Sequence, residues 1–103
     1  MIRLNQILGA VAAELGLERT ALRGDRRYAA VVTGRHYYCW LASKLTNNTL
    51  YAIGRPIGNR DHSTVINSVR RGDVMMVRSG PDRKRMARIL QNIETRLMGD
   101  RKI

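Results

Sequence analysis

Few side chains in this sequence could do covalent or metal chemistry. His36 and Cys39 stand three residues apart on a predicted helix and could share a zinc ion with His62, because imidazole and thiolate both bind zinc. A fourth ligand is missing. Asp61 and His62 could form an acid–base pair, but adjacent residues of a helix diverge by about 100° and no nucleophile accompanies them. The sequence therefore predicts no enzyme activity, no metal site and no cofactor; Cys39 is interpreted as a small packing residue and His36 as a surface or backbone contact.

Arginine is the dominant charged residue. The 103 residues include 19 Lys and Arg against 8 Asp and Glu, which gives a formal net charge of +11. Three of the 19 are lysines and sixteen are arginines, whose planar guanidinium groups bind phosphates and guanine edges with paired hydrogen bonds. This charge exceeds what solubility needs and predicts a polyanionic partner, foremost a nucleic acid.

Helices must position these residues, because no segment shows the period-two alternation typical of a strand. Apolar residues at helical spacing predict one helix over about 4–15, which Gly16 ends, and a long central helix over about 29–45. A shorter helix is predicted between them, over about 18–23.

The second half of the sequence predicts three further helices. Short polar capping residues at 46–49 predict the start of a helix over about 50–55. Turn residues follow, and the next helix opens at Asp61 and is predicted to end at Gly72. A last helix is predicted over about 82–98.

Two short helices that flank a glycine-rich turn and pack on a longer helix are typical of a helix-turn-helix. We therefore predict an all-α fold of five to six helices, a single domain over 1–103 with the helix-turn-helix at about 49–72. The apolar runs are far shorter than the roughly 20 residues of a membrane span, and a lone cysteine cannot form an internal disulfide. These features predict no membrane partner and a cytoplasmic, nucleoid-associated location.

Residues 53–68, Ile-Gly-Arg-Pro-Ile-Gly-Asn-Arg-Asp-His-Ser-Thr-Val-Ile-Asn-Ser, resemble the signature of the C-terminal DNA-binding domain of the bacterial replication initiator DnaA. The Gly-Asn-Arg-Asp-His-Ser-Thr-Val core is the specific part. Matches at 26–27, 41–42 and 45–46 extend the resemblance over about 1–72. The family's ATPase phosphate loop, Gly-x-x-x-x-Gly-Lys-Ser/Thr, does not occur in this sequence. The resemblance implies a DNA-binding domain, of bacterial or phage origin, that is not an initiator by itself.

The resemblance places the start of the recognition helix in the major groove of double-stranded DNA. Asp61, His62, Ser63 and Thr64 occupy those positions here. Hydroxyl and imidazole groups can donate to or accept from base edges, and Ser63 and Thr64 can also touch a thymine methyl. Asp61 could accept from a cytosine amino group or cap the helix, and both roles can coexist.

Four arginines carry the remaining predicted contacts, two of them implied by the resemblance and two by their place beside the turn. Arg27 matches the family's basic residue that enters the adjacent minor groove, where an arginine senses groove width and negative potential. Arg35 matches a position that contacts the DNA. Arg55 and Arg60 flank the turn and are predicted to bind phosphates.

The sequence departs from the family pattern at several positions. Gly72 stands where an apolar residue normally continues the recognition helix. Tyr28 replaces a small polar residue beside the minor-groove arginine, and Tyr51 stands where a proline is common. These changes could alter site preference, so the resemblance predicts the class of ligand more firmly than the family's own origin box as the target.

The aromatic residues allow a second interpretation. Tyr37, Tyr38 and Trp40 could form a stacking platform for single strands. Helical spacing instead favours a place in the core for Tyr37, Trp40 and Leu41. The segment 75–77, Met-Met-Val, is predicted to lie between two helices, where it either packs on the domain or forms a small partner surface.

Because no catalytic module is present, occupancy of DNA is the expected output. We predict a transcriptional regulator that binds as a monomer on an asymmetric site. One alternative is a modulator of replication initiation that competes or cooperates at initiator-type sites. Others are a module that recruits RNA polymerase or replication proteins, and an RNA-binding protein, which equal affinity for duplex RNA would support.

Overall fold

The computed structural model describes residues 2–100, which form helices joined by short links and contain no strand. The elements are α1 (Leu4–Leu15), α2 (Arg19–Arg23), α3 (Ala29–Leu45), α4 (Leu50–Gly54), the 3₁₀ turn η1 (Arg55–Ile57), α5 (His62–Arg78) and α6 (Gly80–Asp100). The predicted all-α fold is confirmed, and the helices expected over 4–15 and 29–45 have those bounds. Within the described range, no helix is both long and apolar enough to span a bilayer.

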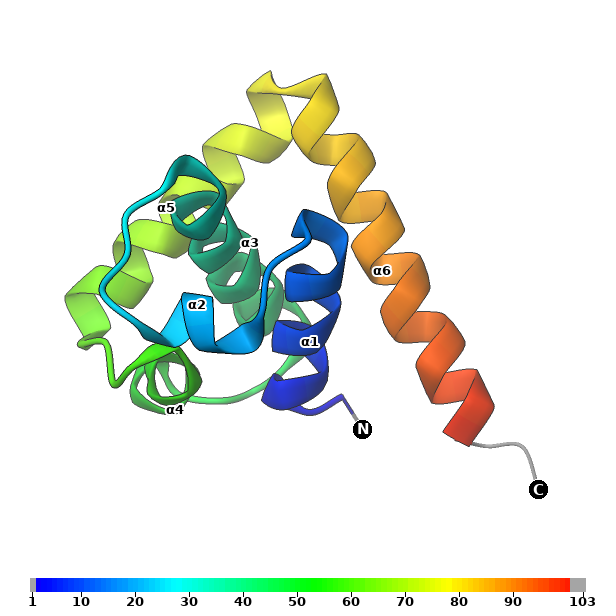
Figure 1. Cartoon of the computed structure of the whole chain (residues 1–103), viewed down its shortest axis with the longest axis horizontal. Helices are drawn as coiled ribbons and strands as arrows, with labels where there is room; N and C mark the ends of the chain where they lie inside the picture. Colours follow the sequence, from blue (N-terminus) through cyan, green and yellow to red (C-terminus); the bar gives the residue numbers. More distant parts are fainter. Residues whose placement is uncertain (1, 101–103) are drawn as a thin grey trace.

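The long helix α3 organises the fold (Figure 1). It packs against α1 and, most extensively, against α5, while α4 and η1 close one end of the bundle. Helices α5 and α6 meet at a sharp corner near Ser79 and then diverge, so that α6 runs along the outer side of α1. The helix-turn-helix, formed by α4, η1 and α5, therefore rests on α3.

The core takes side chains from every helix. Its largest fully buried members are Ile7, Leu8, Val11, Leu22, Val31, Tyr37, Tyr38, Leu41, Ile53, Ile57, Val65 and Ile89. The hydroxyl of Tyr38 donates to the Ile53 carbonyl oxygen at 2.8 Å and so ties α3 to α4. Tyr37 and Leu41 lie in the core as predicted, and Trp40 is partly buried beside them. Because Tyr37 and Tyr38 are fully buried, a stacking platform made of these aromatics is excluded.

The end predicted for the recognition helix is wrong. Helix α5 continues through Gly72 to Arg78, so 75–77 is part of the helix and not a link between two helices. Gly72 is buried, and a Cβ atom built there would lie 2.5 Å from the Cβ of Trp40. The glycine therefore allows α3 and α5 to approach each other closely and does not stop the helix.

Capping and turn residues set the start of the helix-turn-helix. The Thr49 hydroxyl accepts from the Ala52 amide at 3.1 Å and caps α4, as the polar run at 46–49 predicts. Helix α4 ends at Gly54, one residue earlier than predicted. Gly58 has φ 94°, and a Cβ atom there would lie 2.3 Å from the Arg23 carbonyl oxygen. The turn can therefore pack against the end of α2 only with glycine at that position.

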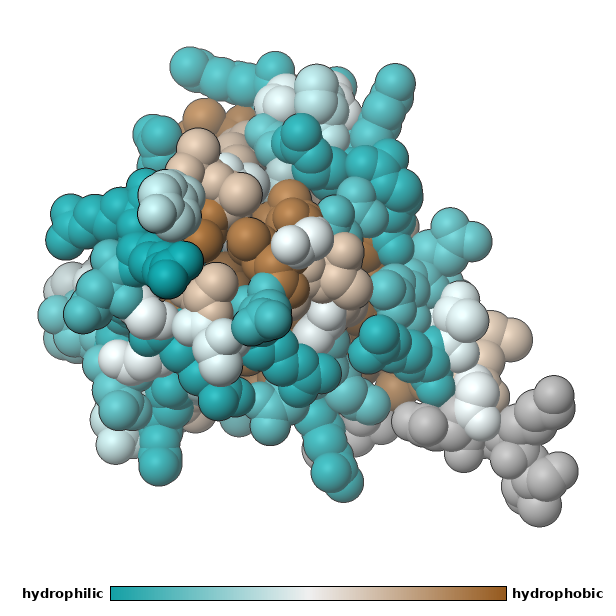
Figure 2. All heavy atoms as spheres, viewed as in Figure 1, coloured by the Kyte–Doolittle hydropathy of each residue, from teal (hydrophilic) through white to brown (hydrophobic). Residues whose placement is uncertain are grey.

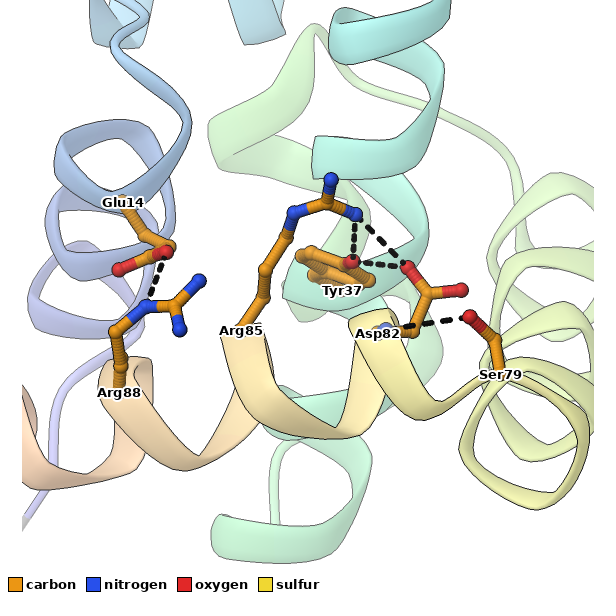
Figure 3. A network of polar contacts seen from close by, with 6 residues as sticks. All are labelled: Glu14, Tyr37, Ser79, Asp82, Arg85 and Arg88. Atoms are coloured by element: carbon orange, nitrogen blue, oxygen red, sulfur yellow. Dashed lines mark hydrogen bonds and ion pairs between the residues drawn. The ribbon is translucent and has the colours of Figure 1, made fainter.

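Polar contacts fix α6 to the rest of the domain (Figure 3). The Tyr37 hydroxyl donates to the Asp82 carboxylate, which also pairs with Arg85 at 3.4 Å. Glu14 of α1 accepts from Arg88 at 2.8 Å. Burial, followed by the hydrogen bond with Asp82, raises the pKa of Tyr37, so its hydroxyl stays protonated as a donor. These contacts hold the first half of α6, which begins at Gly80 and not at 82 as predicted.

Candidate nucleic-acid interface

The first turn of α5 is exposed and polar. Asp61 is its N-cap, and its carboxylate accepts from the Thr64 amide at 2.8 Å. The hydrogen bonds from Thr64, first from the amide and then from the hydroxyl, lower the pKa of Asp61. The capping role proposed for Asp61 is thus confirmed. His62, Ser63 and Thr64 are all exposed, so their side chains are available to a ligand.

The two arginines that flank the turn differ in their surroundings. Arg55 is exposed, and its guanidinium lies 5.8 Å from the ring centroid of Tyr51. Arg60 is partly buried and donates from Nε to the Ile57 carbonyl oxygen at 2.8 Å, and from a second nitrogen to the Gly24 carbonyl oxygen. Arg60 therefore joins the turn to the segment before α3, whereas Arg55 faces solvent.

Arg35 is likewise engaged with backbone oxygens. Its Nε donates to the Leu22 carbonyl at 3.0 Å, and a second nitrogen donates to the Arg26 carbonyl at 2.9 Å. The third nitrogen contacts the carbonyls of Ala21 and Gly24. Burial, followed by the charge of Arg60, lowers the pKa of Arg35. Its donors hold α2 and the segment 24–28 against α3, while its positive charge stays close to the surface.

The segment 24–28 displays two exposed side chains beside this anchor. Arg27 is exposed, as a residue entering a groove must be. Tyr28 is 67% exposed, and the Arg26 guanidinium lies 5.9 Å from its ring centroid. Because the carbonyls of Gly24 and Arg26 are bound by Arg35, the segment is fixed to the domain at two points.

A shallow hollow of about 220 Å³ brings four of the predicted interface residues together. Arg27, Arg35, Arg60 and Thr64 line it, together with three residues that the sequence did not assign to the interface, Val32, His36 and Ser68. None of these lining residues is acidic. The hollow therefore connects the segment before α3 with the first turns of α5 through a positively charged depression.

His36 is half-buried at the contact between α3 and α5. Its Nδ1 lies 3.1 Å from the Ser68 hydroxyl oxygen. Burial lowers the pKa of His36, and the charges of Arg71 and Arg35 lower it further. No local pattern could have revealed this pairing, because His36 and Ser68 are 32 residues apart.

Cys39 behaves as the packing residue that its setting on α3 predicts. It is fully buried, and burial raises the pKa of its thiol to about 12. Within residues 2–100, no three His, Cys, Asp or Glu side chains gather in a way that could hold a metal ion.

Hydrophilic side chains cover most of the face shown in Figure 2, around a central apolar area over α1, α2 and the start of α3. Leu17, Ala21 and the charged residues Glu18, Asp25 and Arg26 are among the residues that line a hollow beside α2. This hollow is separate from the one beside His36, because the two share no lining residue.

An exposed first turn of a long helix, preceded by a tight turn and a short helix and flanked by arginines, defines a helix-turn-helix DNA-binding domain. The chain belongs to the family of bacterial DnaA helix-turn-helix domains, whose family model matches residues 4–71. The match covers α1 to α5 up to the residue before Gly72.

Three relatives carry the name chromosomal replication initiator protein DnaA. The chain is 34% identical to that of Mycoplasma capricolum over 92 residues, 41% to that of Caulobacter vibrioides over 70, and 42% to that of Xanthobacter autotrophicus over 72. These alignments cover 89%, 68% and 70% of this chain. The chain spans only 20%, 14% and 14% of the length of these relatives.

Proposed function

We propose that this chain binds double-stranded DNA sequence-specifically, as a monomer on an asymmetric site, and regulates transcription by occupying that site. The observation that carries the proposal is the bare first turn of α5. His62, Ser63 and Thr64 are exposed there on a helix whose start is fixed by Asp61. The positive end of the helix dipole also favours nearby phosphates.

The arginines have separate roles in this proposal. Arg27 enters the minor groove from the anchored segment 24–28, and Arg55 binds a phosphate beside the turn. Arg35 and Arg60 contribute their charge to the DNA-facing surface while their donors hold backbone carbonyls. Asp61 accepts a hydrogen bond from a base as well as capping α5.

A second candidate function is modulation of replication initiation at initiator-type sites. Membership in the DnaA helix-turn-helix family favours it, since a domain that reads a similar site competes with a full initiator or cooperates beside it. Recruitment of RNA polymerase or of replication proteins is a further form of either function. All of these place the chain on the nucleoid.

The first test is selection from a pool of random duplex DNA by the purified chain, followed by titration of the winners against scrambled duplex at about 0.15 M salt. If about six phosphates are bound, log K falls against log salt with a slope of roughly −5. An enriched asymmetric motif supports the proposal. Tight, salt-sensitive binding without enrichment contradicts sequence-specific recognition, and equal affinity for duplex RNA contradicts a DNA-specific role.

The two candidate outputs are separated with the selected duplex. A promoter that carries the selected site should give a changed transcript level when the chain is added to an in vitro transcription reaction. Displacement of a full-length DnaA from initiator-type boxes, without any effect on transcription, would favour the replication role.

A further inference from the structure

The hollow between α3 and α5 has the charge and the position of a seat for one DNA phosphate. Four cationic or titratable side chains line it, namely Arg27, Arg35, Arg60 and His36. Thr64 and Ser68 contribute hydroxyl groups from successive turns of α5. This inference rests on the proposed DNA binding, because it concerns how the same surface meets the backbone.

Two residues that line the hollow are proposed to enter different grooves of the DNA, and this indicates which part of the duplex lies over the hollow. In the proposed complex, Thr64 lies in the major groove and Arg27 in the adjacent minor groove. A sugar-phosphate backbone separates neighbouring grooves of a duplex. Because Thr64 and Arg27 border the same hollow, the strand between them must pass over it.

His36 is the one group lining the hollow that can change its charge near neutral pH. Nδ1 is paired with Ser68, whose hydroxyl can donate to a neutral ring or accept from a protonated one. Nε2 has no hydrogen-bond partner within the described residues. Every buried side-chain nitrogen in those residues does have a partner, so Nε2 is not a buried atom. Nε2 therefore reaches solvent and can donate to a ligand without a change in the Ser68 contact.

The charges around His36 oppose its protonation in the free chain. Arg35 on its own helix, Arg71 on α5, Arg60 in the turn and Arg27 before α3 are all cationic. The neighbouring Cys39 thiol is neutral, since burial raises its pKa to about 12. A phosphate in the hollow reverses this balance, because an anion beside the ring favours the imidazolium form.

We propose that this hollow seats one backbone phosphate of the bound duplex and that His36 takes up a proton to donate to it from Nε2. DNA binding is then coupled to the uptake of one proton. By linkage, affinity falls as pH rises through the range between the His36 pKa of the free chain and that of the complex.

The experiment measures the His36 pKa directly by NMR, in the intact chain with and without the selected duplex, in a buffer free of phosphate. The chain has two histidines, His36 and His62. The His62→Asn variant lacks the His62 imidazole signal, so the signal that remains belongs to His36. The proposal expects the His36 pKa to rise in the complex. An unchanged or lower His36 pKa in the complex overturns it.

A titration of affinity against pH gives the second readout. Between pH 5.5 and 8, Kd is expected to increase by up to ten-fold for each unit by which DNA raises the His36 pKa. His36→Gln should remove this dependence. His62→Asn, which lacks a proposed base contact and should bind the selected duplex more weakly at every pH, should retain the dependence. If the wild-type chain binds the duplex at pH 8 and His36→Gln shows the same pH dependence of Kd as the wild type, the inference about His36 is overturned but the proposed function is not. Failure to bind duplex at any pH overturns the proposed function as well.

Discussion

The two halves of α5 are built for different tasks. The first turn, from His62 to Thr64, is exposed and polar, and Asp61 caps its start. Beyond the middle of the helix, Gly72 packs closely against Trp40. The Trp40 indole donates to the Asp73 carboxylate at 2.8 Å. Arg83 of α6 then donates to the carbonyls of Met76 and Val77 at 3.1 and 3.0 Å and satisfies the end of α5.

The difference shows how a helix can expose the side chains of one turn to a ligand while packing elsewhere along the helix keeps its position fixed. Burial of Val65 and Ser68, together with the contacts from Gly72 onward, fixes the direction of the helix, so the side chains of its first turn need not pack. A recognition helix that ended at Gly72 would lack the contacts from Asp73 onward.

The largest expected effect is on stability, from Gly72→Ala. The new Cβ atom would lie 2.5 Å from the Cβ of Trp40, so α3 and α5 must move apart. We expect a loss of roughly 2–3 kcal/mol in the free energy of unfolding, measured by urea denaturation. Gly99→Ala is the matched control, because nothing lies within 4 Å of a Cβ atom at Gly99. Equal stabilities of the two variants would show that the close approach of α3 and α5 is wrong.

The next effect is on binding, from His62→Ala in the first half of α5. Because His62 is exposed, the variant should keep its stability, and it should lose about 1–3 kcal/mol of affinity for the selected duplex but little for scrambled duplex. Arg55→Ala, which removes a proposed phosphate contact, should weaken both duplexes alike. Circular dichroism checks the folding of both variants. If His62→Ala lowered the affinity for the selected and the scrambled duplex equally, the proposal that this turn contacts the bases would be contradicted.

A smaller effect is expected from Tyr37→Phe, which removes the hydroxyl that donates to Asp82. We expect a loss of about 1 kcal/mol in stability, measured by urea denaturation, because a buried contact between α3 and α6 disappears. Tyr28→Phe, at a 67% exposed tyrosine, should leave stability unchanged. If both variants were equally stable, the Tyr37–Asp82 contact would not hold α6.

The smallest effect is expected from Asp61→Ala, which removes the cap of α5. Because the pKa of Asp61 is lowered in the folded chain, its contribution is present above its ordinary value of 3.8 and is lost as pH falls through the lowered pKa. The difference in Tm between wild type and variant should therefore be seen at pH 7 and shrink in acid. Asp61→Asn, which keeps an amide oxygen as a cap, should show less loss at pH 7. A difference that is independent of pH would contradict a charged cap.

Local patterns predicted much of the fold. The bounds of α1 and α3 follow from apolar periodicity, and the caps at Thr49 and Asp61 follow from short polar side chains at helix starts. The end of α5 could not be predicted, because the local sequence around Gly72 is typical of a helix C-terminus. The residue that explains it, Trp40, lies 32 positions away.

The candidate site was predictable in its residues but not in its contacts. The resemblance identified the first turn of α5, and the structure leaves those side chains exposed. The contacts of Arg35 and Arg60 with DNA stay a prediction; what the sequence could not predict is that their donors also bind carbonyls 13 and 36 residues away, at Leu22 and Gly24. The place of His36 in the hollow depends on the packing of α3 against α5, which no single segment encodes.

The most direct test of the contrast between the two halves of α5 is amide hydrogen exchange of the intact chain with and without the selected duplex. We predict that DNA protects the segment 24–28, the turn and the first turns of α5. The amides of α5 beyond Gly72 and those of α6 should exchange at nearly the same rate in both states. Protection centred on residues 74–98, with the first turn of α5 unchanged, would contradict the account.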